Sequence, residues 1–120
     1  MVQKSIIQVK SFGFALDIIK LYMQLQEERE YVISKQLLRS GTSIGANIEE
    51  ATAGQSTKDF VHKMSIASKE ARETVYWLRL LQESDLTKIN VSSHIDNAFE
   101  LVRILAAIVK TSESKLRTKN

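Results

Sequence analysis

Histidine and cysteine, the side chains that most often bind zinc and iron, are scarce in this chain. It contains two histidines and no cysteine. A di-iron helical bundle needs two Glu-x-x-His units and two further inward-facing glutamates. Only Asp59-x-x-His62 approximates one such unit, and nothing comparable surrounds His94. We therefore expect both histidines to lie on the surface, and we expect the chain to bind neither a metal ion nor another cofactor.

Two further patterns resemble catalytic motifs but lack the groups that support them. Ser112-x-x-Lys115 matches the S-x-x-K pattern of a lysine-activated serine, but the sequence has no accompanying S-D-N or K-T-G element. Glu49 and Glu50 are adjacent in a predicted helix, so they point about 100° apart and cannot form a facing acid–base pair. The chain is therefore not expected to be an enzyme, unless a site assembles between subunits.

The residues best suited to binding are basic. The candidates on the second and third predicted helices could form a stripe that contacts phosphates: Lys35, Arg39, Lys58, Lys69, Arg72 and Arg79. Asp59, Glu70 and Glu73 lie between them and weaken the positive potential. The net charge is +3, which permits weak attraction to nucleic acid but does not demand it. Trp77 is better suited to anchor a core or an interface than to stack on a base.

The composition indicates one all-α domain, assigned to residues 1–120. Proline is absent, which favours long uninterrupted helices. Apolar spacing predicts helices over about 3–26, 31–52, 57–83 and 93–114, joined by short loops as in an up-down-up-down antiparallel four-helix bundle. No run of apolar residues is long enough to span a bilayer, and no signal peptide is evident. We therefore expect a cytoplasmic protein that does not enter a membrane.

The first predicted helix has two apolar stripes, whereas a monomer needs only one. One stripe follows Phe14, Ile18, Leu21 and Leu25, and the other follows Val9, Phe12, Leu16, Ile19 and Met23. Two stripes indicate a helix that is buried over a wide arc. Either the bundle wraps this helix or another subunit covers it, and the second possibility predicts self-association.

The other predicted helices each have one inner face and recognisable ends. The inner face of the second helix consists of Ile33, Leu37, Ile44, Ile48 and Ala51. That of the third consists of Phe60, Met64, Ala67, Ala71, Thr74, Leu78 and Leu81. That of the fourth consists of Ile95, Phe99, Val102, Ala106 and Val109, with Leu101, Leu105 and Ile108 alongside. The charged run at 27–30 predicts the first turn, and Gly54 predicts the end of the second helix. Ser56 and Ser93 are the expected N-caps of the third and fourth helices. The segment from Arg103 onwards is locally basic.

Gly41 and Gly45 lie inside the second predicted helix, where each costs about 1 kcal/mol relative to alanine. If the chain folds back near residue 55, positions whose numbers sum to about 110 are level with each other in the bundle. Both glycines then lie opposite the small residues Ala67 and Ala71. We therefore expect them to permit a close contact between the second and third helices, with a gain in dispersion energy.

The same register places Arg39 near Glu70 and Glu73, and it places Asn47 near Lys63. We predict that Arg39 pairs with one of these glutamates, either within the chain or across a subunit boundary. The alternative is that these charges are solvated separately, because exposed ion pairs contribute little to stability.

Three stretches carry a resemblance to a known family. QLLRSGTSIGANIEEA at 36–51 and KDFVHKMSIASKEARETVYWLRLL at 58–81 resemble the signature of the 23S rRNA intervening-sequence protein family, and KSFGFALDIIKLYMQL at 10–25 fits it too. This family includes the accessory variability protein of diversity-generating retroelements. Where relatives commonly have proline, this chain has Gly45. The resemblance implies a four-helix bundle that forms a homo-oligomer, pentameric in relatives, whose basic surface binds a reverse transcriptase and nucleic acid in the retroelement branch.

These observations predict a non-enzymatic, homo-oligomeric adaptor. Its basic surface would bind RNA, DNA or a nucleic-acid enzyme such as a reverse transcriptase. The alternative is a purely structural or protein-binding helical bundle with no nucleic-acid role.

Overall fold

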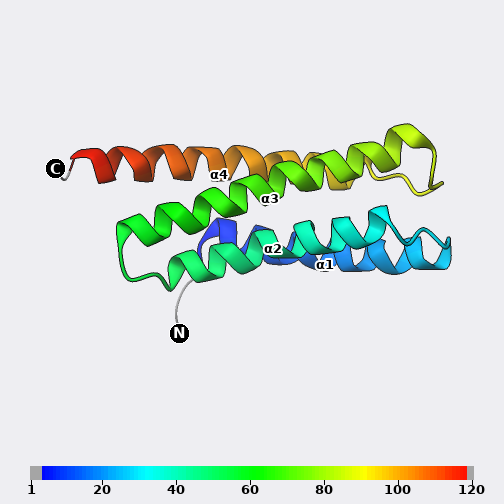
Figure 1. Cartoon of the computed structure of the whole chain (residues 1–120), viewed down its shortest axis with the longest axis horizontal. Coiled ribbons are helices and arrows are strands. Elements are labelled where there is room, and N and C mark those ends of the chain that lie inside the picture. The colour runs from blue at the N-terminus through cyan, green and yellow to red at the C-terminus, as the bar shows by residue number, and fades with distance from the viewer. Residues whose placement is uncertain (1–3, 119–120) are drawn as a thin grey trace.

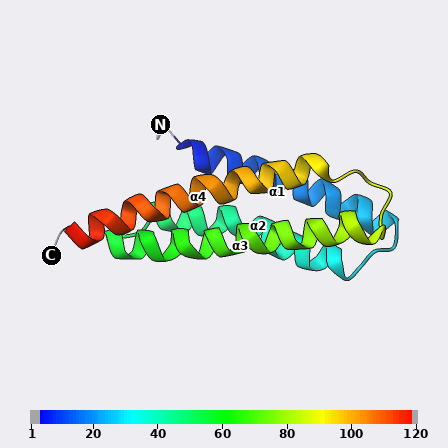
Figure 2. The ribbon, with the colours of Figure 1, turned by 90° about the horizontal axis from the view of Figure 1, so that it is seen from above.

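The computed structural model describes residues 4–118, which form four helices and no strand. The helices are α1 (Ile6–Glu27), α2 (Ile33–Thr52), α3 (Thr57–Ser84) and α4 (Ser92–Thr118). They alternate in direction and make an elongated bundle of 53 × 31 × 20 Å (Figures 1 and 2). Each helix packs on its neighbours in the sequence, and α4 closes the bundle against α1 with the least extensive of the contacts. The predicted all-α four-helix bundle is confirmed.

The first helix buries only one of its two apolar stripes. The stripe of Phe14, Ile18, Leu21 and Leu25 is buried in the core. The other stripe, which we call the α1 ridge, consists of side chains that are 40–64% exposed: Val9, Phe12, Leu16, Ile19 and Met23. The bundle therefore does not wrap α1 on both sides, and the α1 ridge is uncovered within a single chain.

Polar side chains cap the starts of three helices. Ser5 and Gln8 form a capping box at α1. The Ser56 hydroxyl accepts a 3.1 Å hydrogen bond from the Asp59 N–H at α3, as predicted. At α2 the cap is the carboxylate of Glu30, which accepts hydrogen bonds of 2.6–3.1 Å from the N–H groups of Val32, Ile33 and Ser34. This carboxylate satisfies N–H groups that an uncapped helix leaves unpaired.

The glycines of α2 face α1, so the prediction that they face the third helix is wrong. A Cβ atom built on Gly41 would lie 3.0 Å from two side-chain carbons of Ile18, and one built on Gly45 would lie 3.4 Å from the Ser11 hydroxyl oxygen. The sum of two residue numbers predicts whether the residues are level along the bundle, but it does not predict which side of its helix each residue occupies. The residue that faces α3 is Ser40, whose hydroxyl oxygen lies 2.9 Å from that of buried Thr74.

Two smaller predictions about α2 also need correction. The side chain of Asn47 donates to the carbonyl oxygen of Ser43 in its own helix, at 2.8 Å, and Lys63 instead pairs with Glu50, at 2.9 Å. Gly54 follows the end of α2, but it does not adopt the left-handed conformation of a glycine C-cap. The backbone there turns without a positive φ. A Cβ atom at this position would lie 3.0 Å from the carbonyl oxygen of Ala51, so the close approach of the backbone, and not the φ angle, favours glycine.

The third helix follows its predicted inner face closely. Met64, Ala67, Ala71, Thr74, Leu78 and Leu81 are all buried, and Phe60 packs against the core. The helix ends at Ser84, because Asp85 adopts the left-handed conformation with φ of 58°. Arg29, with φ of 64°, makes the turn that the charged run at 27–30 predicts.

The fourth helix differs from its prediction in face, start and length. Its buried residues are Ala98, Leu101 and Leu105. Phe99 is 41% exposed and Ala106 is exposed as well. The inner face is therefore rotated towards Leu101 and Leu105. The helix begins at Ser92, so Ser93 lies in the first turn and is not the N-cap. It also continues beyond the predicted end near 114.

Candidate functional site

The predicted ion pair of Arg39 forms within one chain. One guanidinium nitrogen of Arg39 lies 3.2 Å from a carboxylate oxygen of Glu70 on α3, and another contacts the carboxylate of Glu73. Trp77 donates from its indole N–H to Glu73, at 2.9 Å. The guanidinium therefore bridges α2 and α3, and one of its two partners is itself held by Trp77.

This pairing reduces the ability of Arg39 to contact phosphates, because two carboxylates already neutralise its charge. The Arg39 side chain is about half exposed, so the pair contributes no more than about 1 kcal/mol to stability. Trp77 packs against the core while Tyr76 beside it is exposed, and the two rings meet edge to face with centroids 5.1 Å apart. Trp77 is thus a packing residue in the chain, as the sequence indicated.

The other predicted basic residues fall into two groups. Arg79 pairs with Glu83 one turn later, at 3.2 Å. The remaining cations are exposed and make no ion pair with the described residues 4–118: Lys35, Lys58, Lys69 and Arg72. Lys35 lies near the start of α2, at the opposite end of the bundle from Lys58 at the start of α3 (Figure 1). The predicted residues therefore do not form a single compact patch.

The fourth helix adds basic residues that the sequence reasoning did not join to this set. Arg103, Lys110 and Arg117 are all exposed and lie seven residues apart, so they occupy one face of α4. The basic residues of α3 also share a face, because their separations of 11, 14 and 21 residues from Lys58 are close to whole numbers of turns. Glu70 and Glu73 reach α2, so the basic face of α3 lies on the side away from them.

α3 and α4 pack against each other (Figures 1 and 2), so these two runs of charge lie on neighbouring helices. We call them together the α3–α4 basic face, which comprises Lys58, Lys69, Arg72, Arg79, Arg103, Lys110 and Arg117. The acidic residues beside it include Glu83, which Arg79 already binds, Glu113, and Asp96, which lies seven residues before Arg103 on α4. The seven-residue spacing on α4 was the sequence signal that could have identified its contribution.

Neither histidine belongs to a cluster that could hold a metal ion. Within residues 4–118 no group of three histidine, aspartate or glutamate side chains is arranged to ligate one. His62 is exposed, as expected, but His94 is half-buried between α4 and α1, which corrects the surface position expected for it. Its Nδ1 atom is buried without a hydrogen-bond partner in the described structure. Burial lowers the pKa of His94 from 6.5, and the nearby carboxylate of Asp17 opposes this shift.

Acidification should therefore destabilise the bundle through His94. Its folded pKa lies below the unfolded value of 6.5, so the unfolded chain binds more protons in this range. The stability contributed by neutral His94 is fully present above pH 6.5 and is lost as the pH falls through the folded pKa. Melting curves recorded from about pH 8 to about pH 5 should show a weaker fall in Tm for His94→Gln than for the wild type. Identical pH profiles for the two proteins would contradict this assignment.

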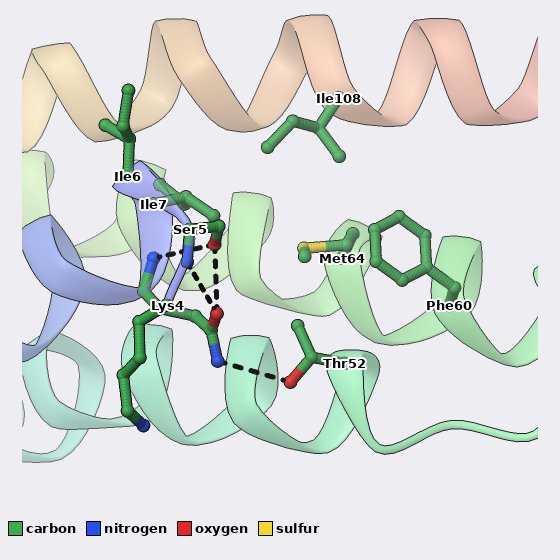
Figure 3. A pocket seen from close by; sticks show the side chains of 9 residues that line it. Lys4, Ser5, Ile6, Ile7, Thr52, Phe60, Met64 and Ile108 are labelled. Atoms are coloured by element: carbon green, nitrogen blue, oxygen red, sulfur yellow. Dashed lines mark hydrogen bonds between the residues drawn. The ribbon is translucent and has the colours of Figure 1, made fainter. Parts of the chain in front are cut away.

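An apolar cleft of about 500 Å³ lies at the end of the bundle where α1 begins (Figure 3). Its apolar lining comes from three helices, with Ile6 and Ile7 of α1, Phe60 and Met64 of α3, and Ile108 of α4, while Thr52 of α2 lies at its edge. The cleft exists because α3 and α4 extend beyond the start of α1 (Figure 1). The polar groups at its edge bind one another, since Gln8 contacts both Ser5 and Thr52. Lys4, the one charged residue in the lining, pairs with Glu49 at 3.4 Å, so the cleft offers mainly apolar contacts.

Comparisons with known proteins agree with this architecture. The chain is similar to a solved structure, described as a protein with unknown function from the S23 ribosomal protein family of Bacteroides thetaiotaomicron. The two are 45% identical with a TM-score of 0.80, and the match covers 88% of this chain and 99% of that one. No curated protein matches the chain. No helix within residues 4–118 is sufficiently long and apolar to cross a membrane. Residues 3–107 match the family model of the 23S rRNA-intervening sequence proteins, and the chain belongs to this family.

Proposed function

We propose that this chain is a non-enzymatic cytoplasmic adaptor that assembles from several copies and binds nucleic acid through its α3–α4 basic face. The observation that carries the proposal is the double run of exposed cations along two adjacent helices. Lys58, Lys69 and Arg72 on α3 make no ion pair with the described residues. Lysine and arginine side chains that are free in this way can neutralise phosphates and release the counterions bound to them.

Assembly would strengthen this weak charge. A single chain carries +3, and a pentamer, the state implied by the resemblance to relatives, would carry five times this charge, about +15. The potential of a whole assembly attracts a polyanion more strongly than that of one subunit. The family is named for the intervening sequences of 23S rRNA, so RNA is the first ligand to test. An enzyme that acts on nucleic acid, such as a reverse transcriptase, would be recruited through the same face.

The second candidate function is a structural or protein-binding bundle without a nucleic-acid role. It is favoured by the neutralisation of Arg39 and Arg79 by neighbouring glutamates, and by the exposure of the α1 ridge. On this reading the apolar surface would be the functional one, and the cations would only keep the protein soluble.

A binding titration across salt concentrations separates the two functions. For the adaptor, we expect single-stranded and double-stranded RNA of unrelated sequence to bind. The logarithm of the association constant should fall linearly with the logarithm of the salt concentration, with a slope of about −0.7 to −0.9 for each phosphate neutralised. Absence of binding at micromolar protein and low salt, or an affinity that does not change with salt, would favour the structural bundle.

A further inference from the structure

The α1 ridge has the spacing of a helix–helix packing seam. Its five side chains follow one another at intervals of three and four residues, from Val9 to Met23, as in the a and d positions of a coiled coil. The seam is about 21 Å long, since fourteen residues separate its ends. Five side chains that are about half exposed present roughly 400–500 Å² of apolar surface, which equals the largest patch on a typical monomer.

A hollow of about 320 Å³ lies beside the ridge, between α1 and α2. Small residues of α2 form one wall, namely Thr42, Gly45 and Ala46, while Phe12, Leu16 and Ile19 of the ridge form part of the other. Gly45 leaves room in this wall because it has no side chain, and the nearest atom to a Cβ atom there belongs to Ser11 of α1. At 3.4 Å from the Ser11 hydroxyl, a methyl group on Gly45 would be an ordinary contact. The monomer therefore tolerates alanine at position 45.

We propose that this face docks a second copy of the chain, with the α1 ridge of one copy seated in the hollow between α1 and α2 of the next. This inference rests on the self-assembly in the proposed function, and it assigns the surfaces that carry it. Ridge and hollow are complementary in shape, because large apolar side chains project beside a wall of small residues. The ridge forms one wall of the hollow through Phe12, Leu16 and Ile19, so ridge and hollow are adjoining parts of one surface. Two copies related by a two-fold axis can each seat the ridge in the hollow of the other.

The area and charge of the face also fit another copy of this chain. A standard interface buries roughly 800 Å² on each partner, and the ridge with the rim of the hollow approaches this area. The ridge carries no charge, and Glu49 is the one charged residue that lines the hollow. The α3–α4 basic face lies on the other two helices, so docking through α1 and α2 leaves it open to nucleic acid.

The first test compares two single variants, each of which replaces an exposed phenylalanine with glutamate, one on α1 and one on α4. Phe12→Glu places a charge in the middle of the proposed contact, and the matched variant Phe99→Glu places the same charge at an exposed phenylalanine on α4. Native mass measurement and sedimentation should show Phe12→Glu shifted towards the 13.6 kDa monomer, with self-association weakened at least about tenfold by the buried charge. Phe99→Glu should keep the wild-type mass. Met23→Glu, at the end of the ridge, is a second variant that places a charge at an exposed position of the proposed contact.

The second test uses two glycines. Gly45→Ala and Gly13→Ala both add a methyl group to a helix, and both should keep or raise the Tm of the monomer, since nothing lies within 4 Å of a Cβ atom on Gly13. Gly45→Ala should weaken self-association by partly filling the hollow, whereas Gly13→Ala should not change it. Circular dichroism verifies that each variant is folded.

The outcomes separate this inference from the nucleic-acid role. A wild-type mass for both folded Phe12→Glu and Met23→Glu would overturn the assigned face, even if RNA binding persists. Equal losses of assembly in Phe12→Glu and Phe99→Glu would overturn it as well, and so would a monomeric wild type. A wild-type assembly that Phe12→Glu dissociates, but that binds no RNA, would support the docking face and remove the nucleic-acid role.

Discussion

Gly41→Val should lower the free energy of unfolding by about 1–3 kcal/mol, the usual cost of overpacking a filled core. A Cβ atom at this position already lies 3.0 Å from two carbons of buried Ile18, and the two γ-methyl groups of valine need still more room. Valine is a better helix former than glycine by a few tenths of a kcal/mol, so the steric cost decides the sign. Urea denaturation monitored by circular dichroism measures the change.

A second background makes this prediction specific to the contact with α1. Ile18→Ala alone should cost about 2–5 kcal/mol, because it opens a cavity in the core. In that background Gly41→Val should cost much less than in the wild type, since the valine methyl groups enter the vacated space. Gly13→Val is the matched control, because a Cβ atom there meets no neighbour within 4 Å. Additive effects of the changes at positions 41 and 18 would show that the two residues do not share this space.

The double charge reversal Lys69→Glu with Arg72→Glu should weaken RNA binding by at least about tenfold and reduce the salt slope by about 1.5–2. Both cations are exposed on the α3–α4 basic face and make no ion pair with residues 4–118. Reversal removes two phosphate contacts and adds repulsion at the same points. Fluorescence anisotropy with a labelled RNA, measured at several salt concentrations, gives both quantities.

A control with the same change in net charge separates a local effect from a general one. Arg29→Glu with Lys88→Glu reverses two exposed cations in the loops at the opposite end of α3 from Lys58. This variant should retain most of the affinity if the α3–α4 basic face binds RNA. Equal weakening by both pairs would mean that only the total charge matters, and would argue against a defined face.

The sequence was sufficient to predict the fold because the periodic signals were long and consistent. The seam of α3 is predicted correctly, since steps of four and three sustained over three heptads leave one possible inner face. Arg39 was placed beside Glu70 and Glu73 because ion pairs between neighbouring helices depend mainly on height along the bundle.

Errors arose where the rotation of a helix about its axis decided the contact. Gly41 and Ser40 are adjacent, yet one faces α1 and the other faces α3, so an error of about 100° in rotation exchanges the neighbour. Alanines and isoleucines lie on several sides of α4, which left its inner face poorly determined. The Glu30 cap was missed because the carboxylate reaches N–H groups from outside the helix, and the usual cap residues do not mark it. The free cations of the basic face could not be identified before the pairing of every neighbour was known.

The limited contact between α1 and α4 has a consequence for how the native state loosens. The α2–α3 interface is the most extensive in the bundle, and the α1–α4 seam is the least extensive. Breathing motions should therefore begin where α1 peels away from α4, while the middle pair of helices stays closed. Amide protons on the inner side of α4 would then exchange with solvent sooner than those of α2. Another copy bound to α1 would slow the separation of α1 from α4, so oligomerisation would also stabilise the least extensive helix contact of the subunit.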